Sequence, residues 1–93
     1  MLEELRVNDL YTKKPSQIVM YTTDYCPDCK RAKAFFEANK IEYLRVRLED
    51  NEEAAKFVEQ INNGYRSVPT IIFPDGSILV EPGNEKLQEK FRG

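Results

Sequence analysis

The amino-acid sequence predicts an α/β domain with a four-stranded mixed sheet flanked by helices. Short apolar runs typical of strands alternate with segments whose apolar residues recur every three or four positions, in the order β-α-β-α-β-β-α. The helix between the first two strands makes them parallel through a right-handed crossover, whereas a tight turn between the last two makes them antiparallel. The two kinds of connection together predict a mixed sheet.

The length of 93 residues fits one domain with a modest core. We divide the chain into an N-terminal arm, residues 1–15, and a folded domain, residues 16–93. In the arm, Leu2, Leu5 and Leu10 could share one helical face, but Asn8-Asp9 and Lys13-Lys14-Pro15 break this pattern. We therefore expect the arm to be flexible or loosely docked.

The first strand and the first helix of the domain are closely spaced. Ile18–Tyr21 is a continuous apolar run, typical of a strand buried on both faces. The following helix is predicted to have Cys26 as its N-cap and Pro27 at its first position, where a missing N–H costs nothing. It runs to about Asn39. Its predicted inward face consists of Cys29, Ala32, Phe35 and Phe36.

The middle of the chain predicts a second strand and a second helix. Ile41–Leu48 contains alternating apolar and polar residues, as a strand does. Asp50 lies three residues before Glu53, which resembles a capping box and predicts a helix start near Asp50. An Asn-Asn-Gly run at 62–64 ends this helix. Its predicted buried stripe is Ala54, Phe57, Val58 and Ile61.

The last third predicts a hairpin and a short helix. Thr70–Phe73 and Ile78–Val80 are apolar runs separated by the turn Pro74–Ser77. Asn84 is predicted to cap the final helix, which carries Leu87 and Phe91 one turn apart.

Charge and hydropathy exclude several classes of partner. A net charge of −2 gives no attraction to nucleic acid or anionic membranes. Met1–Glu4 is acidic and lacks the features of a signal peptide, and no apolar run approaches the roughly 18 residues that span a bilayer. We therefore expect a cytoplasmic protein with no nucleic-acid partner and no membrane partner.

Cys26 and Cys29 are the only cysteines, and the chain has no histidine. The free N–H groups and the dipole at a helix N-terminus favour the reactive thiolate form of a cysteine. A structural disulfide would not persist in a reducing cytoplasm, and a structural zinc ion needs four ligands, so we expect no metal site. The pair is therefore interpreted as a redox site.

Five motifs carry a resemblance to a known family: Met20–Thr23, Cys26–Cys29, Ala54–Val58, Asn62–Thr70 and Phe73–Ser77. On these motifs the chain resembles the glutaredoxins, and most of all the short bacterial proteins of mycoredoxin type. The resemblance spans roughly residues 17–92 and implies a thioredoxin-like fold.

The resemblance also implies roles for individual residues. Cys26 would be the attacking thiolate and Cys29 the resolving thiol. Pro69 would follow a cis peptide bond, and Val68 would pair its backbone with the substrate. The residues expected to bind the substrate or a small thiol are Tyr25, Arg66, Val68, Pro69, Asn84 and Glu85.

Two departures from the family pattern concern the small thiol. Glutaredoxins that bind glutathione usually carry a Gly-Gly-x-Asp run before the last helix, and its Asp holds the γ-glutamyl amine. This chain has Pro82-Gly83-Asn84-Glu85 there, so Asn84 or Glu85 must substitute. The redox motif also has Pro-Asp between its cysteines instead of the common Pro-Tyr. Glutathione and mycothiol therefore both remain candidates.

The implied function is that of a thiol–disulfide oxidoreductase. It would reduce protein disulfides, or mixed disulfides between proteins and a small thiol, with no tightly bound cofactor. Its partners would be S-thiolated or disulfide-containing proteins and a small thiol with its NADPH-dependent reductase, and we expect a monomer. Two alternatives stay open: a thioredoxin-like electron donor reduced by a flavoprotein reductase, and an iron–sulfur cluster carrier.

Overall fold

Four short strands form one mixed sheet in the computed structural model, which describes residues 10–92. The strands are β1 (Val19–Thr22), β2 (Leu44–Arg47), β3 (Thr70–Ile72) and β4 (Ile78–Val80), and the helices are α2 (Pro27–Ala38), α3 (Glu52–Ile61) and α4 (Asn84–Arg92). The strand order is β2-β1-β3-β4. β1 runs parallel to β2 and antiparallel to β3, and β3 and β4 form an antiparallel hairpin. The predicted fold class and element order are therefore confirmed.

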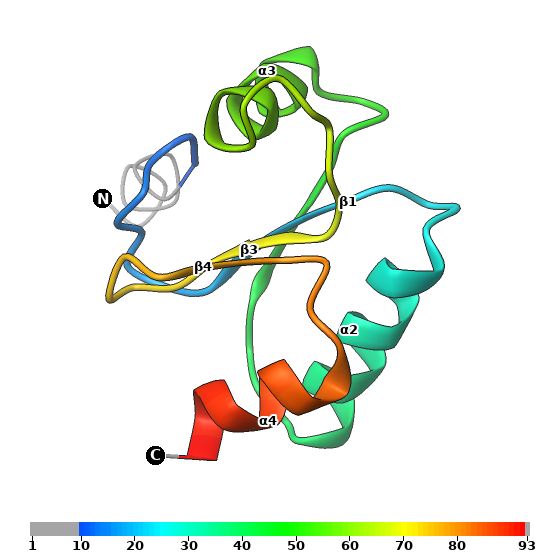
Figure 1. Cartoon of the computed structure of the whole chain (residues 1–93), viewed down its shortest axis with the longest axis vertical. Helices are drawn as coiled ribbons and strands as arrows, with labels where there is room; N and C mark the ends of the chain where they lie inside the picture. The colour runs from blue at the N-terminus through cyan, green and yellow to red at the C-terminus, as the bar shows by residue number, and fades with distance from the viewer. Residues whose placement is uncertain (1–9, 93) are drawn as a thin grey trace.

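The helices cover opposite faces of this sheet, with α2 and α4 on one side and α3 on the other (Figure 1). Successive residues of β1 point to opposite faces, so Val19 and Tyr21 pack on the α3 side while Met20 packs on the α2–α4 side. All three side chains are fully buried. Because both faces of β1 are covered, the position of its C-terminal end is fixed, and the loop that follows starts from this fixed point.

The second strand is shorter than the predicted Ile41–Leu48. Ile41 lies beyond α2 but takes part in its C-terminal cap, since its N–H donates to the Phe36 carbonyl at 2.9 Å. Lys40 takes a left-handed backbone conformation, with φ of 55°, to make this turn. Strand pairing starts only where the Leu44 N–H donates to the Ile18 carbonyl at 2.8 Å.

Two predicted helix caps are wrong by one residue each. α3 is capped by Asn51 and not by Asp50, because the Asn51 side chain accepts a hydrogen bond from the Ala54 N–H at 3.0 Å. At α4, the Gly83 carbonyl accepts the first helical hydrogen bond, so Asn84 is the first helical residue and not the cap.

The described part of the arm packs on the α3 side of the sheet. Leu10 contacts the core there, and the Tyr11 N–H donates to the buried Tyr21 hydroxyl at 3.1 Å. Asn51 donates from its side-chain amide to the Tyr11 hydroxyl at 2.8 Å. Residues 1–9 of the predicted arm lie outside the described residues, and the boundary at residue 15 stays a prediction. Within residues 10–92, every helix is too short or too polar to cross a membrane.

Candidate active site

Cys26 lies at the N-cap of α2, as the sequence predicts. Its backbone is extended, with φ of −94° and ψ of 116°, and Pro27 occupies the first helical position. The Cys29 N–H donates a hydrogen bond to the Cys26 sulfur at 3.2 Å. This sulfur therefore takes the place of the oxygen in an ordinary N-cap and faces the positive end of the helix dipole.

The two cysteines differ in exposure, although both are free thiols. Cys26 is half-buried, whereas Cys29 is completely buried. Burial, together with the hydrogen bond to Cys26, raises the pKa of Cys29 from about 9 to about 12. Of the two cysteines, only Cys26 therefore has exposed surface, while Cys29 stays a protonated thiol at neutral pH.

The Val68–Pro69 loop lies directly against the Cys26 sulfur. The Cys26 thiol donates a hydrogen bond to the Val68 carbonyl at 3.4 Å, across 42 residues of sequence. The Val68–Pro69 peptide bond is cis, as the resemblance implied, and Pro69 is buried. The structure thus brings Cys26, Cys29, Val68 and Pro69 into one site.

Side-chain hydrogen bonds hold this loop in place. The Thr70 hydroxyl donates to the Ser67 carbonyl at 2.7 Å and accepts from the Asn62 amide at 3.1 Å. Thr70 is itself buried in the sheet at the start of β3. The Thr70 hydroxyl therefore joins the loop at Ser67 to the start of β3 and to Asn62 at the C-terminal end of α3.

Arg66 is half exposed and already has two acidic partners. Its guanidinium pairs with Glu59 and, at 3.1 Å, with Glu52, both on α3. The hydrogen bond with Glu59 and the charges of both glutamates raise the pKa of Arg66. A substrate carboxylate would therefore have to compete with these two glutamates for Arg66.

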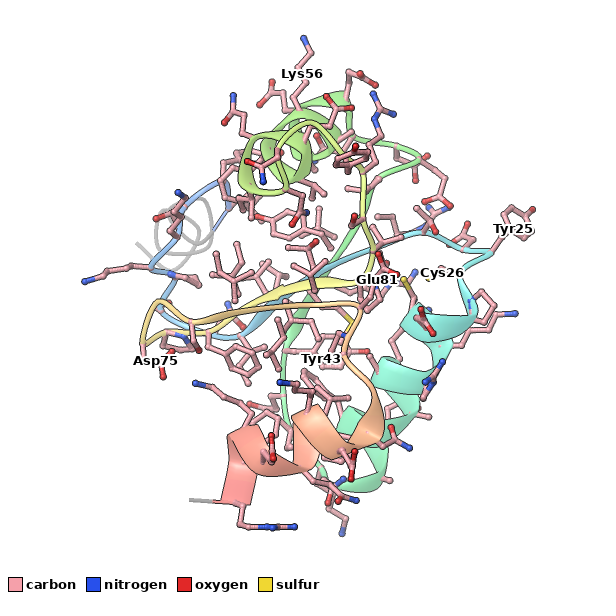
Figure 2. The ribbon with its side chains drawn as sticks, in the orientation of Figure 1. Tyr25, Cys26, Tyr43, Lys56, Asp75 and Glu81 are labelled. Carbon is pink, nitrogen blue, oxygen red and sulfur yellow. The ribbon has the colours of Figure 1, made fainter. Side chains whose placement is uncertain are left out.

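The other predicted binding residues lie at the edge of the site. Tyr25 is 90% exposed and points away from the body of the protein (Figure 2). Asn84 and Glu85 are exposed on the first turn of α4, and within residues 10–92 neither makes a hydrogen bond or ion pair with the cysteines. The structure therefore leaves these three side chains free to contact a ligand.

One residue of the site was not predicted from the sequence. Glu81 has a left-handed backbone, with φ of 50°, and its N–H donates to the Pro69 carbonyl at 2.9 Å. Figure 2 shows Glu81 on the side of the molecule where Cys26 lies. Its position before Pro82 gives no indication of this conformation, because residues before proline favour extended backbone.

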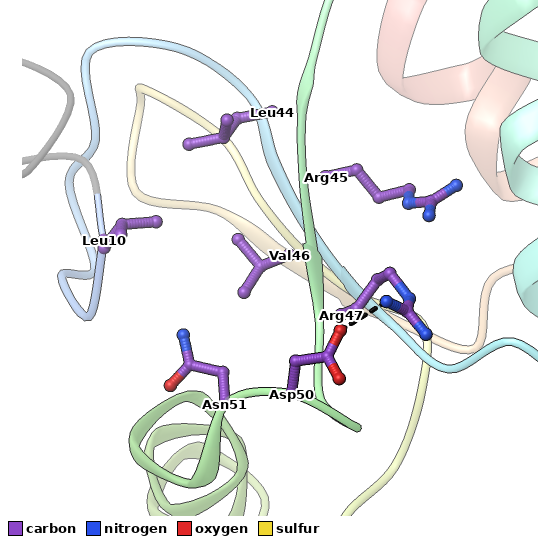
Figure 3. A pocket seen from close by; sticks show the side chains of 7 residues that line it. All are labelled: Leu10, Leu44, Arg45, Val46, Arg47, Asp50 and Asn51. Carbon is purple, nitrogen blue, oxygen red and sulfur yellow. Dashed lines mark hydrogen bonds and ion pairs between the residues drawn. The ribbon is translucent and has the colours of Figure 1, made fainter.

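A pocket lies elsewhere, along the edge strand β2 (Figure 3). Its volume is about 460 Å³, and it is lined by Leu10, Leu44, Arg45, Val46, Arg47, Asp50 and Asn51. None of the predicted site residues lines it. The pocket and the Cys26 site are therefore separate places on the molecule.

Comparison with known proteins identifies the family. The sequence profile of the glutaredoxin family matches residues 18–78. The chain is 42% identical over 73 residues to a Mycobacterium tuberculosis protein named provisionally as a glutaredoxin, a match that covers 78% of this chain and 87% of that protein. It is 33% identical over 67 residues to mycoredoxin 1 of Corynebacterium glutamicum, with 72% of this chain and 82% of that protein covered.

Solved structures agree with this assignment. The crystal structure of a thioredoxin-like protein superimposes with a TM-score of 0.68 at 29% identity, covering 78% of this chain and 97% of that one. A glutaredoxin from Archaeoglobus fulgidus gives a TM-score of 0.67 at 28% identity, covering 83% of this chain and 87% of that one. The chain therefore has a thioredoxin-like fold, belongs to the glutaredoxin family and is a thiol–disulfide oxidoreductase.

Proposed function

We propose that this protein reduces mixed disulfides between proteins and a small thiol, with Cys26 as the nucleophile. The Cys26 thiolate attacks the small-thiol sulfur of the mixed disulfide. A new disulfide forms between Cys26 and the small thiol, and the target protein leaves as a thiolate that takes a proton from water. The reduction of the target is thereby balanced by the oxidation of Cys26.

Two routes complete the cycle. In the first, a second small thiol attacks the adduct, which yields the disulfide of the small thiol and frees Cys26. In the second, Cys29 loses its proton and attacks the Cys26 sulfur, which releases the small thiol and forms the Cys26–Cys29 disulfide. An NADPH-dependent reductase system then returns the oxidised product of either route to the thiol form.

The observation that carries this proposal is the unequal access to the two sulfurs. The Cys26 sulfur is reachable and accepts the Cys29 N–H at 3.2 Å, a donor that stabilises a thiolate. The buried Cys29 holds its proton until the adduct forms beside it. This difference supports the assignment of attack to Cys26 and of resolution to Cys29.

The substrate backbone is proposed to pair with Val68 in the manner of an added strand. The Cys26 thiol already donates to the Val68 carbonyl, so a disulfide at this sulfur would lie next to free backbone groups of the loop. Tyr25 and Arg66 would contact the protein substrate, and Asn84 and Glu85 would contact the small thiol.

For the small thiol we infer mycothiol in preference to glutathione. One relative is named mycoredoxin 1, and the two relatives found by sequence and reported above come from a mycobacterium and a corynebacterium. Glutathione carries two carboxylates, but Arg66 already pairs with two glutamates, and Glu85 adds negative charge at the start of α4. A sugar thiol without a carboxylate avoids this conflict. We place the reaction in the cytoplasm, where reducing conditions keep both cysteines as thiols.

The test measures reduction of one protein mixed disulfide prepared with each small thiol in turn. Wild type is assayed with mycothiol or glutathione, each with its own reductase and NADPH, alongside Cys26→Ser and Cys29→Ser. We expect faster turnover with mycothiol, no turnover in Cys26→Ser and residual turnover in Cys29→Ser. Equal or faster turnover with glutathione would reject the mycothiol inference alone, and turnover in Cys26→Ser would reject the mechanism.

A thioredoxin-like electron donor is the second candidate, favoured by the likeness to a thioredoxin-like protein at a TM-score of 0.68. Such a donor would be reduced directly by a flavoprotein reductase, with no small thiol present. Omitting the small thiol from the same assay separates the two: turnover that persists supports the donor. An iron–sulfur carrier would instead purify under anaerobic conditions as a brown protein with cluster absorbance bands.

A further inference from the structure

The loop that carries Cys26 is attached to the neighbouring strand β2 by a compact group of charged residues. Arg47 donates to both carboxylate oxygens of Asp24, from Nε at 3.0 Å and from Nη2 at 2.5 Å. The Asp24 backbone N–H in turn donates to the Glu49 carboxylate at 2.6 Å. Asp24 is therefore held through its side chain and through its backbone.

The sheet explains why these residues meet. β1 and β2 are parallel, and Thr22 pairs with Arg47 at their C-terminal ends. Asp24 follows β1 by two residues and precedes Cys26 by two, so it lies midway along the short connection to α2. A bidentate contact between a guanidinium and a carboxylate fixes the relative orientation of the two groups as well as their distance.

We propose that Arg47 is a positioning residue for the reactive sulfur: it holds Asp24 and thereby sets Cys26 against the Cys29 N–H and the Val68 carbonyl. Arg47 touches neither sulfur, so it acts only through the loop. The guanidinium of Arg47 also donates a hydrogen bond from Nη1 to Asp50, and this second contact helps to orient it (Figure 3). The inference rests on the proposed role of Cys26 as the nucleophile.

The ionisation of the pair supports this role. The hydrogen bond from Arg47 lowers the pKa of Asp24, and the same contact raises the pKa of Arg47. Both partners are therefore charged throughout the pH range in which a thiolate is reactive, and the contact persists under those conditions.

Strand β2 supplies a matched control. Arg45 lies two residues before Arg47 on the same face of the strand, and its charge also acts on Asp24, but within residues 10–92 its side chain makes no hydrogen bond or ion pair with that carboxylate. Replacing Arg45 removes the same charge from the same strand without releasing the Cys26 loop.

The experiment measures the rate of alkylation of Cys26 by iodoacetamide at pH 7.5 (roughly physiological) in a Cys29→Ser background, well below the melting temperature. We expect Arg47→Gln to slow alkylation by about fivefold, since the sulfur is no longer held against its N–H donor, and Arg47→Lys to be intermediate. Arg45→Gln should stay within about twofold of the parent. This readout needs no disulfide substrate, so it can fail independently of the proposed function.

A double-mutant cycle tests whether Arg47 acts through Asp24. If it does, Asp24→Ala slows alkylation to a similar extent, and the double variant is no slower than the slower single variant. Additive effects, or an Arg47→Gln rate within about twofold of the parent, would overturn the proposal. If circular dichroism shows that Arg47→Gln does not fold, the alkylation rate of Asp24→Ala serves as the test. A slower rate supports the proposal, and an unchanged rate rejects it.

Discussion

Helices α2 and α3 begin with the same hydrogen bond. In α2 the Cys26 sulfur accepts the N–H of the residue three positions later at 3.2 Å, and in α3 the Asn51 side-chain oxygen accepts the corresponding N–H at 3.0 Å. Both cap residues have extended backbones. Each cap therefore satisfies one of the free donors of its first helical turn.

The two caps differ in what surrounds them. The amide of Asn51 also donates to Tyr11, and this contact joins α3 to the arm. The Cys26 sulfur instead faces the Val68 carbonyl and remains accessible. The same local geometry thus stabilises α3 and, in the function proposed above, holds a reactive thiol at the start of α2; the surroundings of each cap make the difference.

The strongest test of this contrast is Cys26→Ser. Serine is a good N-cap, so the free energy of unfolding should stay within about 0.5 kcal/mol of wild type. Turnover of a mixed disulfide should fall at least about a thousandfold, because a hydroxyl does not replace a thiolate as nucleophile. Chemical denaturation checks the expected stability, and the turnover assay checks the expected loss of activity. A turnover near wild type would contradict the role of Cys26.

Cys29→Ser should remove the internal disulfide route and leave the small-thiol route. Reduction of a protein disulfide should be lost, while removal of a small thiol from a protein should continue at a reduced rate, within about tenfold of wild type. Mass spectrometry of the trapped intermediate should show the small thiol on Cys26. Full activity on a protein disulfide in this variant would show that Cys29 does not resolve.

The raised pKa of Cys29 predicts that the stability of the folded protein depends on pH. Folding raises its pKa from about 9 to about 12, so the folded state holds the proton more tightly than the unfolded state. The resulting stabilisation is complete below pH 9 and is lost as the pH rises toward 12. Denaturation of reduced wild type over this range should therefore show a steeper loss of stability than Cys29→Ser does. Parallel curves for the two proteins would refute the pKa shift.

At the N-cap of α3, Asn51→Ala should destabilise the folded protein without affecting turnover. Loss of an N-cap oxygen costs about 1 kcal/mol of the free energy of unfolding, measured by urea denaturation. Asn51→Asp is the matched control, because it keeps the capping oxygen and should lose less. A drop in turnover as large as that of Cys26→Ser would mean that the two caps are not functionally separate.

The smallest effect is expected at Asp28, the acidic residue in the first turn of α2. Its carboxylate pairs with Arg31 near the surface, so Asp28→Asn should change stability by less than about 0.5 kcal/mol. Removing a negative charge close to a thiolate should raise the alkylation rate of Cys26 by roughly twofold. A slower rate would show that Asp28 assists Cys26 instead.

The features that the sequence predicts well are local. The Cys26 cap and the position of Pro27 follow from capping preferences over four residues, and the hairpin between β3 and β4 follows from its turn. The cis bond at Pro69 was implied by the resemblance alone. The cap and the hairpin depend on short-range patterns, which a single sequence displays directly, whereas the cis bond does not.

The features that cannot be predicted from the sequence depend on tertiary contacts. Arg47 and Asp24 are 23 residues apart and meet only because β1 and β2 end together. A second contact of Arg47 accounts for the misplaced cap of α3, because Asp50 pairs with Arg47 and Asn51 takes the capping position. The ion pairs of Arg66 with two glutamates of α3 are likewise not visible in the sequence, and its expected role in binding the substrate or a small thiol stays a prediction.

The sulfur cap of α2 also links the stability of the helix to electron transfer. The Cys29 N–H is bonded to the Cys26 sulfur in the reduced protein, and this bond is weakened when the sulfur enters a neutral disulfide. The cap therefore stabilises the reduced state more than the oxidised state. For a two-electron couple, a cap of about 1 kcal/mol corresponds to roughly 20 mV, in the direction that makes the disulfide a stronger oxidant. The first turn of α2 is thus one of the elements that set the reduction potential.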